Sequence, residues 1–158
     1  MTRIVPCLWF DGQAEEAARF YVSLLPQTSR IDSVVPQTVD TPGGKAGGTL
    51  TVEFTLDGQR FLALNGGPYF TPNGAVSFII ECDGQGEIDR LWDAILAAGG
   101  KEIECGWITD RYGYHLQIVP KAFSDMIREP SRSAAVMQAM MGMKKLDLAR
   151  LEAAWRGS

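Results

Sequence analysis

The sequence predicts an α+β fold in which two tandem βαβββ modules form a cupped, eight-stranded mixed sheet, followed by a C-terminal helical extension. An internal repeat, a recurring order of strands and a change to helical periodicity after Pro120 together indicate this fold. At roughly 150 residues per domain, a chain of 158 residues is one domain or two small fused halves. We expect the paired modules at residues 1–120, as 1–68 and 75–120, and the extension at residues 121–158.

The repeat becomes visible when the sequence is shifted by 72 residues. Phe10–Glu15 then falls on Cys82–Glu87, and Asp-Gly-Gln follows an apolar segment in both copies. Apolar residues recur at helical spacing after each of these turns, so each copy predicts a strand, a turn and an amphipathic helix. Pro26 and the pair Gly99-Gly100 are expected to end the two helices.

Each copy also predicts three strands after its helix. In chain order, the expected strands are Ile4–Phe10, Arg30–Val35, Thr49–Leu56, Arg60–Leu64, Val76–Cys82, Glu102–Cys105, Gly106–Thr109 and Tyr114–Val119. The dipeptide Asp57-Gly58 is typical of a two-residue hairpin turn. A module of about 60 residues buries too little surface to be stable alone. We therefore expect the modules to join their sheets about a pseudo-twofold axis, with a ligand on the concave face.

The remaining residues predict three further helices. These are expected at Ala122–Arg128, Ser133–Met143 and Leu146–Trp155. Met137, Met140 and Met141 share one helical face, which either packs against the body or a partner subunit, or forms a Met-rich ligand surface. Residues 1–120 carry a net charge of −7 and the extension carries +3. This asymmetry favours docking on the chain's own body or on a second copy, and we expect a homodimer.

The overall composition is that of a globular protein, with 46% hydrophobic and 22% charged residues. A net charge of −4 gives no reason to expect nucleic acid as a partner. No apolar run approaches the roughly 20 residues of a membrane span, and the first residues do not resemble a signal peptide. Cys7, Cys82 and Cys105 are too widely spaced for a disulfide framework or a zinc ribbon. We therefore expect a cytoplasmic protein with no membrane partner.

Several segments resemble a known family. They are Phe20-Tyr21, Phe61–Pro68, Cys105–Gly113 and Gln117–Pro120. In this order they look like the PhnB-like branch of the vicinal oxygen chelate superfamily, which includes glyoxalase I, bleomycin-resistance and fosfomycin-resistance proteins and extradiol dioxygenases. The resemblance covers residues 3 to about 128 and implies the paired modules, a dimer and a small-molecule ligand. This branch carries the label 3-demethylubiquinone-9 3-methyltransferase.

The resemblance also locates where metal-binding relatives place their ligands. Those His and Glu positions fall here on Pro6, on Ala75 or Ser77, and on Gln117. Proline and alanine have no side-chain donor and a neutral amide is a weak ligand, so we expect neither a metal nor another cofactor. Methyl transfer would need a Gly-rich turn between a strand and a helix, and no glycine pair of this sequence has that context.

The expected ligand-contacting residues are Asn65, Ser77, Trp107, His115 and Gln117. The resemblance implies that Gln117 faces the ligand, and strand alternation then places His115, the only histidine, on the same face. The chain has Tyr114-His115-Leu116 where relatives more often have Val-Ser-Trp. Three of these residues also have a structural interpretation: Asn65 caps the following turn, Ser77 bonds locally, and His115 makes an ordinary hydrogen bond at a strand end.

Other reactive groups are open to two interpretations as well. Cys7 and Cys82 are either nucleophiles or inert thiols. Glu53 and Glu81 either serve as a general base in the cup or face solvent from their strands. The function we expect is metal-free binding of a small molecule. The alternatives are a divalent-metal-dependent enzyme of the same superfamily and the methyltransferase of the family label.

Overall fold

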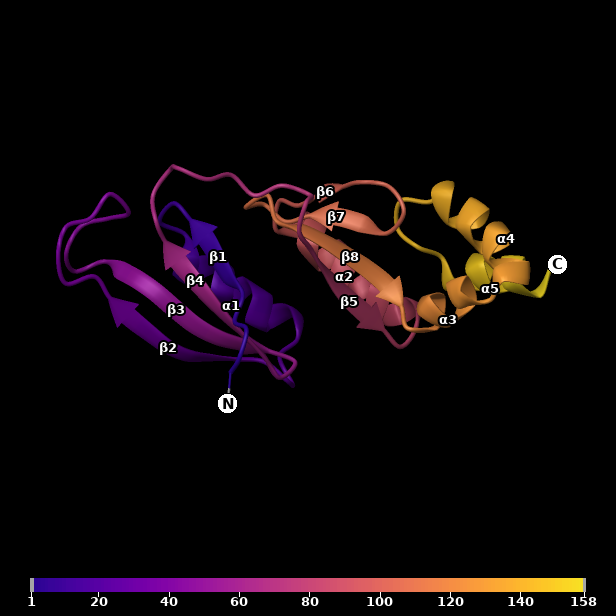
Figure 1. The fold of residues 1–158 in the computed structure, drawn as a ribbon, viewed down its shortest axis with the longest axis horizontal. Coiled ribbons are helices and arrows are strands. Elements are labelled where there is room, and N and C mark those ends of the chain that lie inside the picture. Colours follow the sequence, from indigo (N-terminus) through magenta and orange to yellow (C-terminus); the bar gives the residue numbers. More distant parts are fainter. Residues whose placement is uncertain (1, 158) are drawn as a thin grey trace. The chain divides into compact units, whose positions relative to one another are not determined.

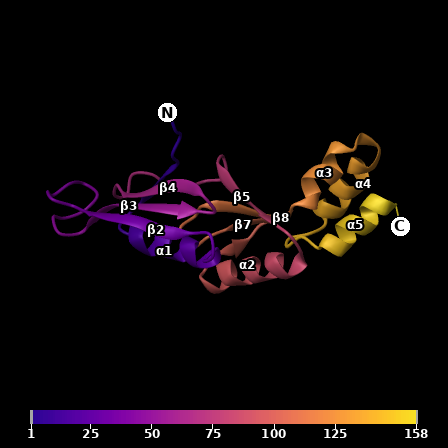
Figure 2. The ribbon, with the colours of Figure 1, turned by 90° about the horizontal axis from the view of Figure 1, so that it is seen from below.

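A computed structural model describes residues 2–157, and its strands form two four-stranded sheets (Figure 1). The chain divides into a first unit, residues 1–72, and a second unit, residues 73–158. Each unit contains one of the sheets with a helix on one of its faces (Figure 2). The α+β fold with two sheets and C-terminal helices is confirmed, whereas the joining of both sheets into one cupped surface stays a prediction.

The first unit has the expected βαβββ order. Its elements are β1 (Cys7–Phe10), α1 (Ala14–Leu24), β2 (Arg30–Pro36), β3 (Thr49–Leu56) and β4 (Gln59–Asn65). The sheet order is β1-β4-β3-β2, with β1 parallel to β4 and the other neighbours antiparallel. Asp57 and Gly58 have φ angles of 44° and 81°, the left-handed pair that a tight two-residue hairpin requires. The predicted hairpin is therefore confirmed.

The second unit repeats this topology. Its elements are β5 (Ser77–Cys82), α2 (Gln85–Ala97), β6 (Lys101–Glu102), β7 (Trp107–Thr109) and β8 (His115–Pro120). The sheet order is β5-β8-β7-β6, again with the first and last strands parallel and adjacent. Because the strand orders of the two units correspond one to one, the internal repeat inferred from the sequence is a structural repeat.

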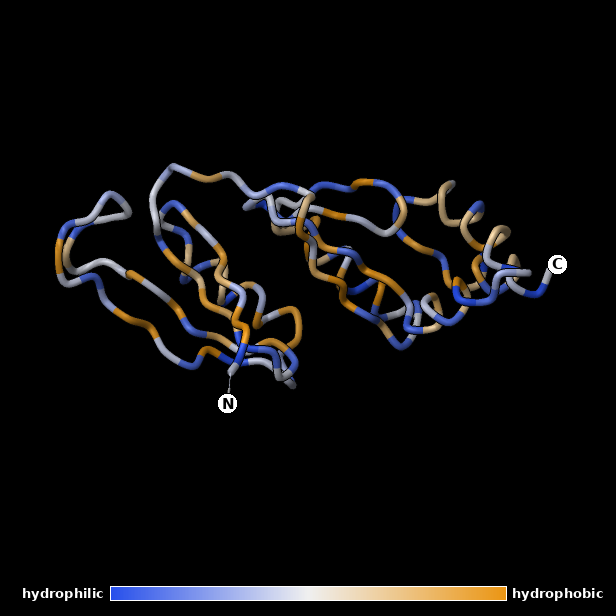
Figure 3. The backbone as a smooth tube through the Cα atoms, in the orientation of Figure 1, coloured by the Kyte–Doolittle hydropathy of each residue, from blue (hydrophilic) through white to orange (hydrophobic). Residues whose placement is uncertain are grey.

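Strand alternation directs apolar side chains toward the helix of each unit. In the first unit the side chains of Tyr21, Phe54 and Phe61 are buried, and their rings form a stack between α1 and the sheet. In the second unit Ile108, Leu116 and Ile118 are buried on the side of α2. Apolar stretches accordingly mark the strands of both sheets (Figure 3). One face of each sheet is thus packed against the helix of the same unit.

Two strands are shorter than the sequence predicts by two residues or more. The first begins at Cys7 rather than Ile4, whose side chain is exposed. The strand expected at Glu102–Cys105 keeps only Lys101 and Glu102. Cys105 instead adopts a φ of 60°, and its N–H donates to the Met143 carbonyl at 2.7 Å, which removes it from the ladder.

The C-terminal extension forms three helices that pack within the second unit. They are α3 (Ala122–Arg128), α4 (Pro130–Met141) and α5 (Leu148–Arg156). α4 begins at Pro130, three residues before the predicted start, because proline is favoured in the first turn of a helix. Asp147 caps α5 by accepting from the Arg150 N–H at 3.1 Å. Within residues 2–157, no helix has the length and apolarity needed to cross a membrane.

Candidate functional site

The second sheet has one face that α2 does not cover. Leu116 and Ile118 of β8 point toward α2, so His115 and Gln117 between them point to the opposite side. We call this surface the open face of the second sheet and define it by Ser77, Ile79, Trp107, His115 and Gln117.

The strand register brings these residues together. Ser77 of β5 is the partner of His115, and Ile79 is the partner of Gln117. On the other side of β8, Trp107 of β7 is also paired with Gln117. Four of the five predicted site residues therefore share one face, although they come from three strands.

Hydrogen bonds fix the polar groups of the open face. Gln117 donates from Nε2 to Ser77 Oγ at 2.9 Å. This bond orients the side-chain amide and leaves its Oε1 as an acceptor. Nδ1 of His115 lies 3.1 Å from the Gly113 carbonyl oxygen. Because a carbonyl can only accept, Nδ1 carries the hydrogen in this bond, and Nε2 of the neutral ring is then an acceptor.

Aromatic and aliphatic groups complete the open face. The Trp107 and His115 rings meet edge to face, with centroids 6.3 Å apart and an interplanar angle of 71°. Ile79, which pairs with Gln117 from β5, is 59% exposed. This combination offers an apolar surface with a few directed polar groups, which is the usual composition of a small-molecule site.

Asn65, the fifth predicted residue, lies in the first unit and is used differently. Alternation along β4 places Asn65 on the same face as Ala63, toward α1, and its side chain is buried. Its Oδ1 accepts from the Ala14 N–H at 3.0 Å, and its Nδ2 donates to the Thr49 carbonyl at 2.9 Å. The side chain thus caps the first turn of α1 and links it to β3, rather than capping the turn that follows it.

The first sheet also has a face that its helix leaves open, and it carries a tryptophan that the sequence analysis did not single out. Leu8 is buried toward α1, so Cys7 and Trp9 lie on the opposite face. Trp9 donates from Nε1 to the Gly67 carbonyl at 2.8 Å and packs edge to face on Phe70. Alternation with Leu8 was the signal that could have located Trp9.

Comparisons with known proteins agree with this architecture. A family model described as 3-demethylubiquinone-9 3-methyltransferase matches residues 2–119. A solved structure described as a putative 3-demethylubiquinone-9 3-methyltransferase, PhnB protein, from Bacillus cereus is 32% identical, with a TM-score of 0.66. The alignment covers 75% of this chain and 99% of that one. The chain belongs to this PhnB-like family.

More distant structures share the fold of the PhnB-like chain. A protein from Pseudomonas aeruginosa is 21% identical over 76% of this chain and 98% of its own, with a TM-score of 0.61. A fosfomycin resistance protein from Listeria monocytogenes is 11% identical over 77% and 94%, with a TM-score of 0.51. No curated protein matches the sequence. The match to the family model ends at residue 119, just before the extension.

Cys7 and Cys82 of this PhnB-like protein are poor nucleophiles. Burial raises the pKa of the Cys82 thiol to about 12, with the negative charge of Glu87 adding to the effect. Partial burial also raises the pKa of Cys7. Because the thiolate is the reactive form, both groups are overwhelmingly protonated thiols near neutral pH.

The carboxylates that the sequence analysis named as alternative bases occupy strand positions. Glu53 of β3 accepts from Ser33 Oγ at 3.3 Å and lies 3.7 Å from an Arg60 nitrogen. Glu81 of β5 is exposed. Glu53 is therefore held in an ion pair within the first unit.

The side chains at the ligand positions of metal-binding relatives do not fit a divalent ion. Gln117 and Ser77 supply a neutral amide and a hydroxyl that bond to each other, and Pro6 has no donor. Within the described residues 2–157, no group of three or more His, Cys, Asp or Glu side chains is placed to hold a metal.

In three of the four glycine pairs, one member packs closely against another part of the fold instead of forming the open turn that an S-adenosylmethionine site needs. A Cβ on Gly43 would lie 2.2 Å from the Asn65 carbonyl oxygen, and one on Gly66 would overlap the Trp9 ring. A Cβ on Gly100 would lie 2.5 Å from the Thr109 carbonyl oxygen. Close packing of the chain on itself therefore accounts for these glycines.

The two hydrogen bonds of Asn65 predict a structural cost when its amide is removed. We expect Asn65→Ala to lower the free energy of unfolding by about 2–3 kcal/mol, because the buried Ala14 N–H and the partly buried Thr49 carbonyl lose their partner. Urea denaturation followed by circular dichroism measures this change. Asn73→Ala is the matched control, since Asn73 is exposed, and we expect it to cost less than about 1 kcal/mol. Equal losses in the two variants would contradict the capping role.

The raised thiol pKa values predict selective resistance to alkylation. In the native protein at pH 7.5 we expect iodoacetamide to leave Cys82 unmodified, because the side chain is fully buried as well as protonated. The exposed Cys7 is expected to react slowly, and all three cysteines are expected to react in urea. Peptide mapping by mass spectrometry measures each site. Native Cys82 that reacted as fast as Cys7 would show that the strand end opens.

Proposed function

We propose that this PhnB-like protein binds a small molecule with an aromatic or apolar part on the open face of the second sheet, without a divalent metal. The observation that carries the proposal is the convergence of Ser77, Trp107, His115 and Gln117 on one uncovered sheet face. These side chains are neither solvent-directed charges nor core residues, so their shared face is suited to a ligand.

The chemistry of the open face defines the class of ligand. The Trp107 indole presents an apolar ring against which a flat ligand can pack, and Ile79 adds a second apolar group on the other side of Gln117. Ser77 holds the side-chain amide of Gln117 in place. A donor group of a ligand can therefore bond to Oε1 of Gln117 without the cost of ordering this side chain. A hydroxyl or amine on an aromatic or apolar body has the matching chemistry.

Two enzymatic activities compete with this proposal. The family description names a methyltransferase, but Gly43, Gly66 and Gly100, which belong to three of the glycine pairs, are engaged in close packing. A metal-dependent reaction of the superfamily type would require anionic or imidazole ligands at positions where Gln117 and Ser77 bond to each other. The residues present therefore favour binding over either reaction.

Assembly and location are part of the same proposal. We propose a homodimer in the cytoplasm, on the basis of the family resemblance and of unpaired, widely spaced cysteines. We also propose that residues 121–158 are an addition to the paired modules at 1–120, because the family match ends at residue 119.

Two substitutions on the open face test the binding proposal. In a titration of labelled protein with aromatic fragments, we expect a bound fragment to shift the Trp107 indole and Gln117 amide signals. Gln117→Ala is expected to weaken its affinity about fivefold, the value of one hydrogen bond of about 1 kcal/mol. Trp107→Ala is expected to weaken it about thirtyfold, or about 2 kcal/mol, as for a central aromatic contact.

The control for these variants is Gln138→Ala, an exposed glutamine on α4 that should leave the affinity unchanged. A fragment that bound wild type and both open-face variants equally would place the binding site elsewhere. The same conclusion against the proposal would follow if no aromatic fragment bound saturably.

The donor chemistry predicts indifference to divalent ions. We expect the melting temperature of chelator-treated protein to change equally little with Mn²⁺, Ni²⁺, Zn²⁺ and Fe²⁺, because a bound ion would stabilise the native state by mass action. Thermal unfolding at a fixed excess of each ion makes the comparison. A rise of several degrees with a single ion would favour the metal-dependent enzyme instead.

A further inference from the structure

The open face of the second sheet ends where the extension begins to cover it. His115, Gln117 and Val119 alternate along β8 and point to the same side. The first two are half-buried, whereas Val119 is only 9% exposed. Val119 packs into a cluster whose other buried members all come from the extension: Met126, Val136, Met143, Leu146 and Leu151. Gln117 therefore lies one pleat, or roughly 7 Å, from an apolar wall that the extension builds.

The extension also holds the turn from which Trp107 emerges. Cys105 and Gly106 have φ angles of 60° and 82°, so two consecutive residues are in the left-handed region, and Cys105 is not a glycine. Backbone of this kind persists only where its surroundings fix it. The direction in which Trp107 leaves the turn depends on this conformation.

Contacts from two sides fix the turn. The N–H groups of Cys105 and Gly106 donate to the carbonyls of Met143 and Lys144, each at 2.7 Å. On the other side, the Gly106 carbonyl accepts from the Ile118 N–H at 2.9 Å. A Cβ on Gly106 would lie 2.9 Å from Cγ of Leu146, so the extension packs directly on the turn.

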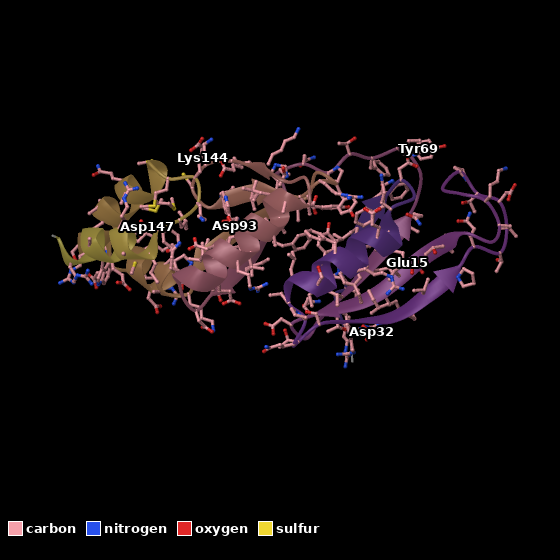
Figure 4. The ribbon with its side chains drawn as sticks, turned by 180° about the vertical axis from the view of Figure 1, so that it is seen from behind. Glu15, Asp32, Tyr69, Asp93, Lys144 and Asp147 are labelled. Carbon is pink, nitrogen blue, oxygen red and sulfur yellow. The ribbon has the colours of Figure 1, made fainter. Side chains whose placement is uncertain are left out.

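The segment that makes these contacts is itself tied to α2. The Gln85 side chain donates to the Leu146 carbonyl at 3.0 Å and accepts from the Leu148 N–H at 2.8 Å. Lys145 lies 2.9 Å from a carboxylate oxygen of Asp89 and 3.7 Å from one of Asp93. Figure 4 shows Asp93 on α2, and Lys144 and Asp147 on the segment between α4 and α5. Lys144 also lies 3.6 Å from Glu102.

We propose that residues 143–146 are a positioning element of the binding site: they fix the 105–106 turn, and with it Trp107, and they close the open face behind Gln117. This inference rests on the proposed function. Because the family match ends at residue 119, the extension gives this chain an end wall and a Trp107 support that the matched region alone does not contain. The extension thereby limits the length of a ligand that the open face can hold.

The positioning role is tested by the ¹⁹F spectrum of full-length protein labelled with 5-fluorotryptophan, with Trp107→Phe assigning the Trp107 signal. We expect Leu146→Ala to shift and broaden that signal, because the packing on Gly106 is lost. Leu151→Ala is the matched control: Leu151 is equally buried in the same cluster, and its loss should leave the Trp107 signal in place.

A second variant covers the case in which Leu146→Ala does not fold. Gln85→Ala removes both side-chain hydrogen bonds to the segment, and we expect a smaller shift of the Trp107 signal in the same direction. An unchanged Trp107 signal in folded Leu146→Ala or Gln85→Ala would overturn the proposal, as would an equal change in Leu151→Ala.

The end wall is tested with 4-alkylphenols of increasing chain length as probes. We expect wild-type affinity to rise with chain length up to a limit, and Leu146→Ala to move that limit to longer chains. If affinity stops rising at the same chain length in Leu146→Ala as in wild type, the extension does not set ligand length, and the proposed end wall is contradicted. If no 4-alkylphenol binds wild type, both the end wall and the proposed function are contradicted for this ligand class. The ¹⁹F spectrum tests the support of Trp107 independently of ligand binding.

Discussion

Parallel pairing of the first and last strands of each module is the constraint on which the rest of the structure depends. In the second unit it sets Ser77 beside His115 and Ile79 beside Gln117. A slip of one residue in this register would move every side chain of the strand to the opposite face. Leu116 and Ile118 would then lose their burial against α2, and Gln117 would be forced into the core. The burial of the apolar face therefore selects the register that assembles the open face.

The open face tolerates polar groups because they satisfy one another. A glutamine amide on a half-buried sheet costs free energy unless its donors and acceptors find partners. Ser77 supplies one such partner from the adjacent strand, and Gly113 supplies another for His115. The hydrogen bonds that make these residues compatible with the fold also orient the groups that a ligand would meet. The contacts that stabilise the sheet would thus also serve the proposed recognition.

Local patterns in the sequence were enough for the fold and for part of the candidate site. Alternation along Tyr114–Val119 put His115 and Gln117 on one face, and the repeat gave the correct βαβββ order of elements along each unit. The capping of α1 by Asn65 was missed, because it depends on a contact across 51 residues. The shortening of the strand at Cys105 was missed for a similar reason: backbone bonds to Met143 and Lys144 leave no side-chain signature.

The charge asymmetry of the sequence is explained within one chain, because the basic extension docks on acidic α2. Hydrogen bonds from Gln85 and then Lys145 lower the pKa of Asp89, and the Asp89 carboxylate raises the pKa of Lys145. The contribution of Asp89 to stability is lost only as pH falls through its lowered pKa. The contribution of Lys145 is lost only as pH rises through its raised pKa. Both groups are charged throughout the neutral range, so the ion pair between the extension and α2 is retained there.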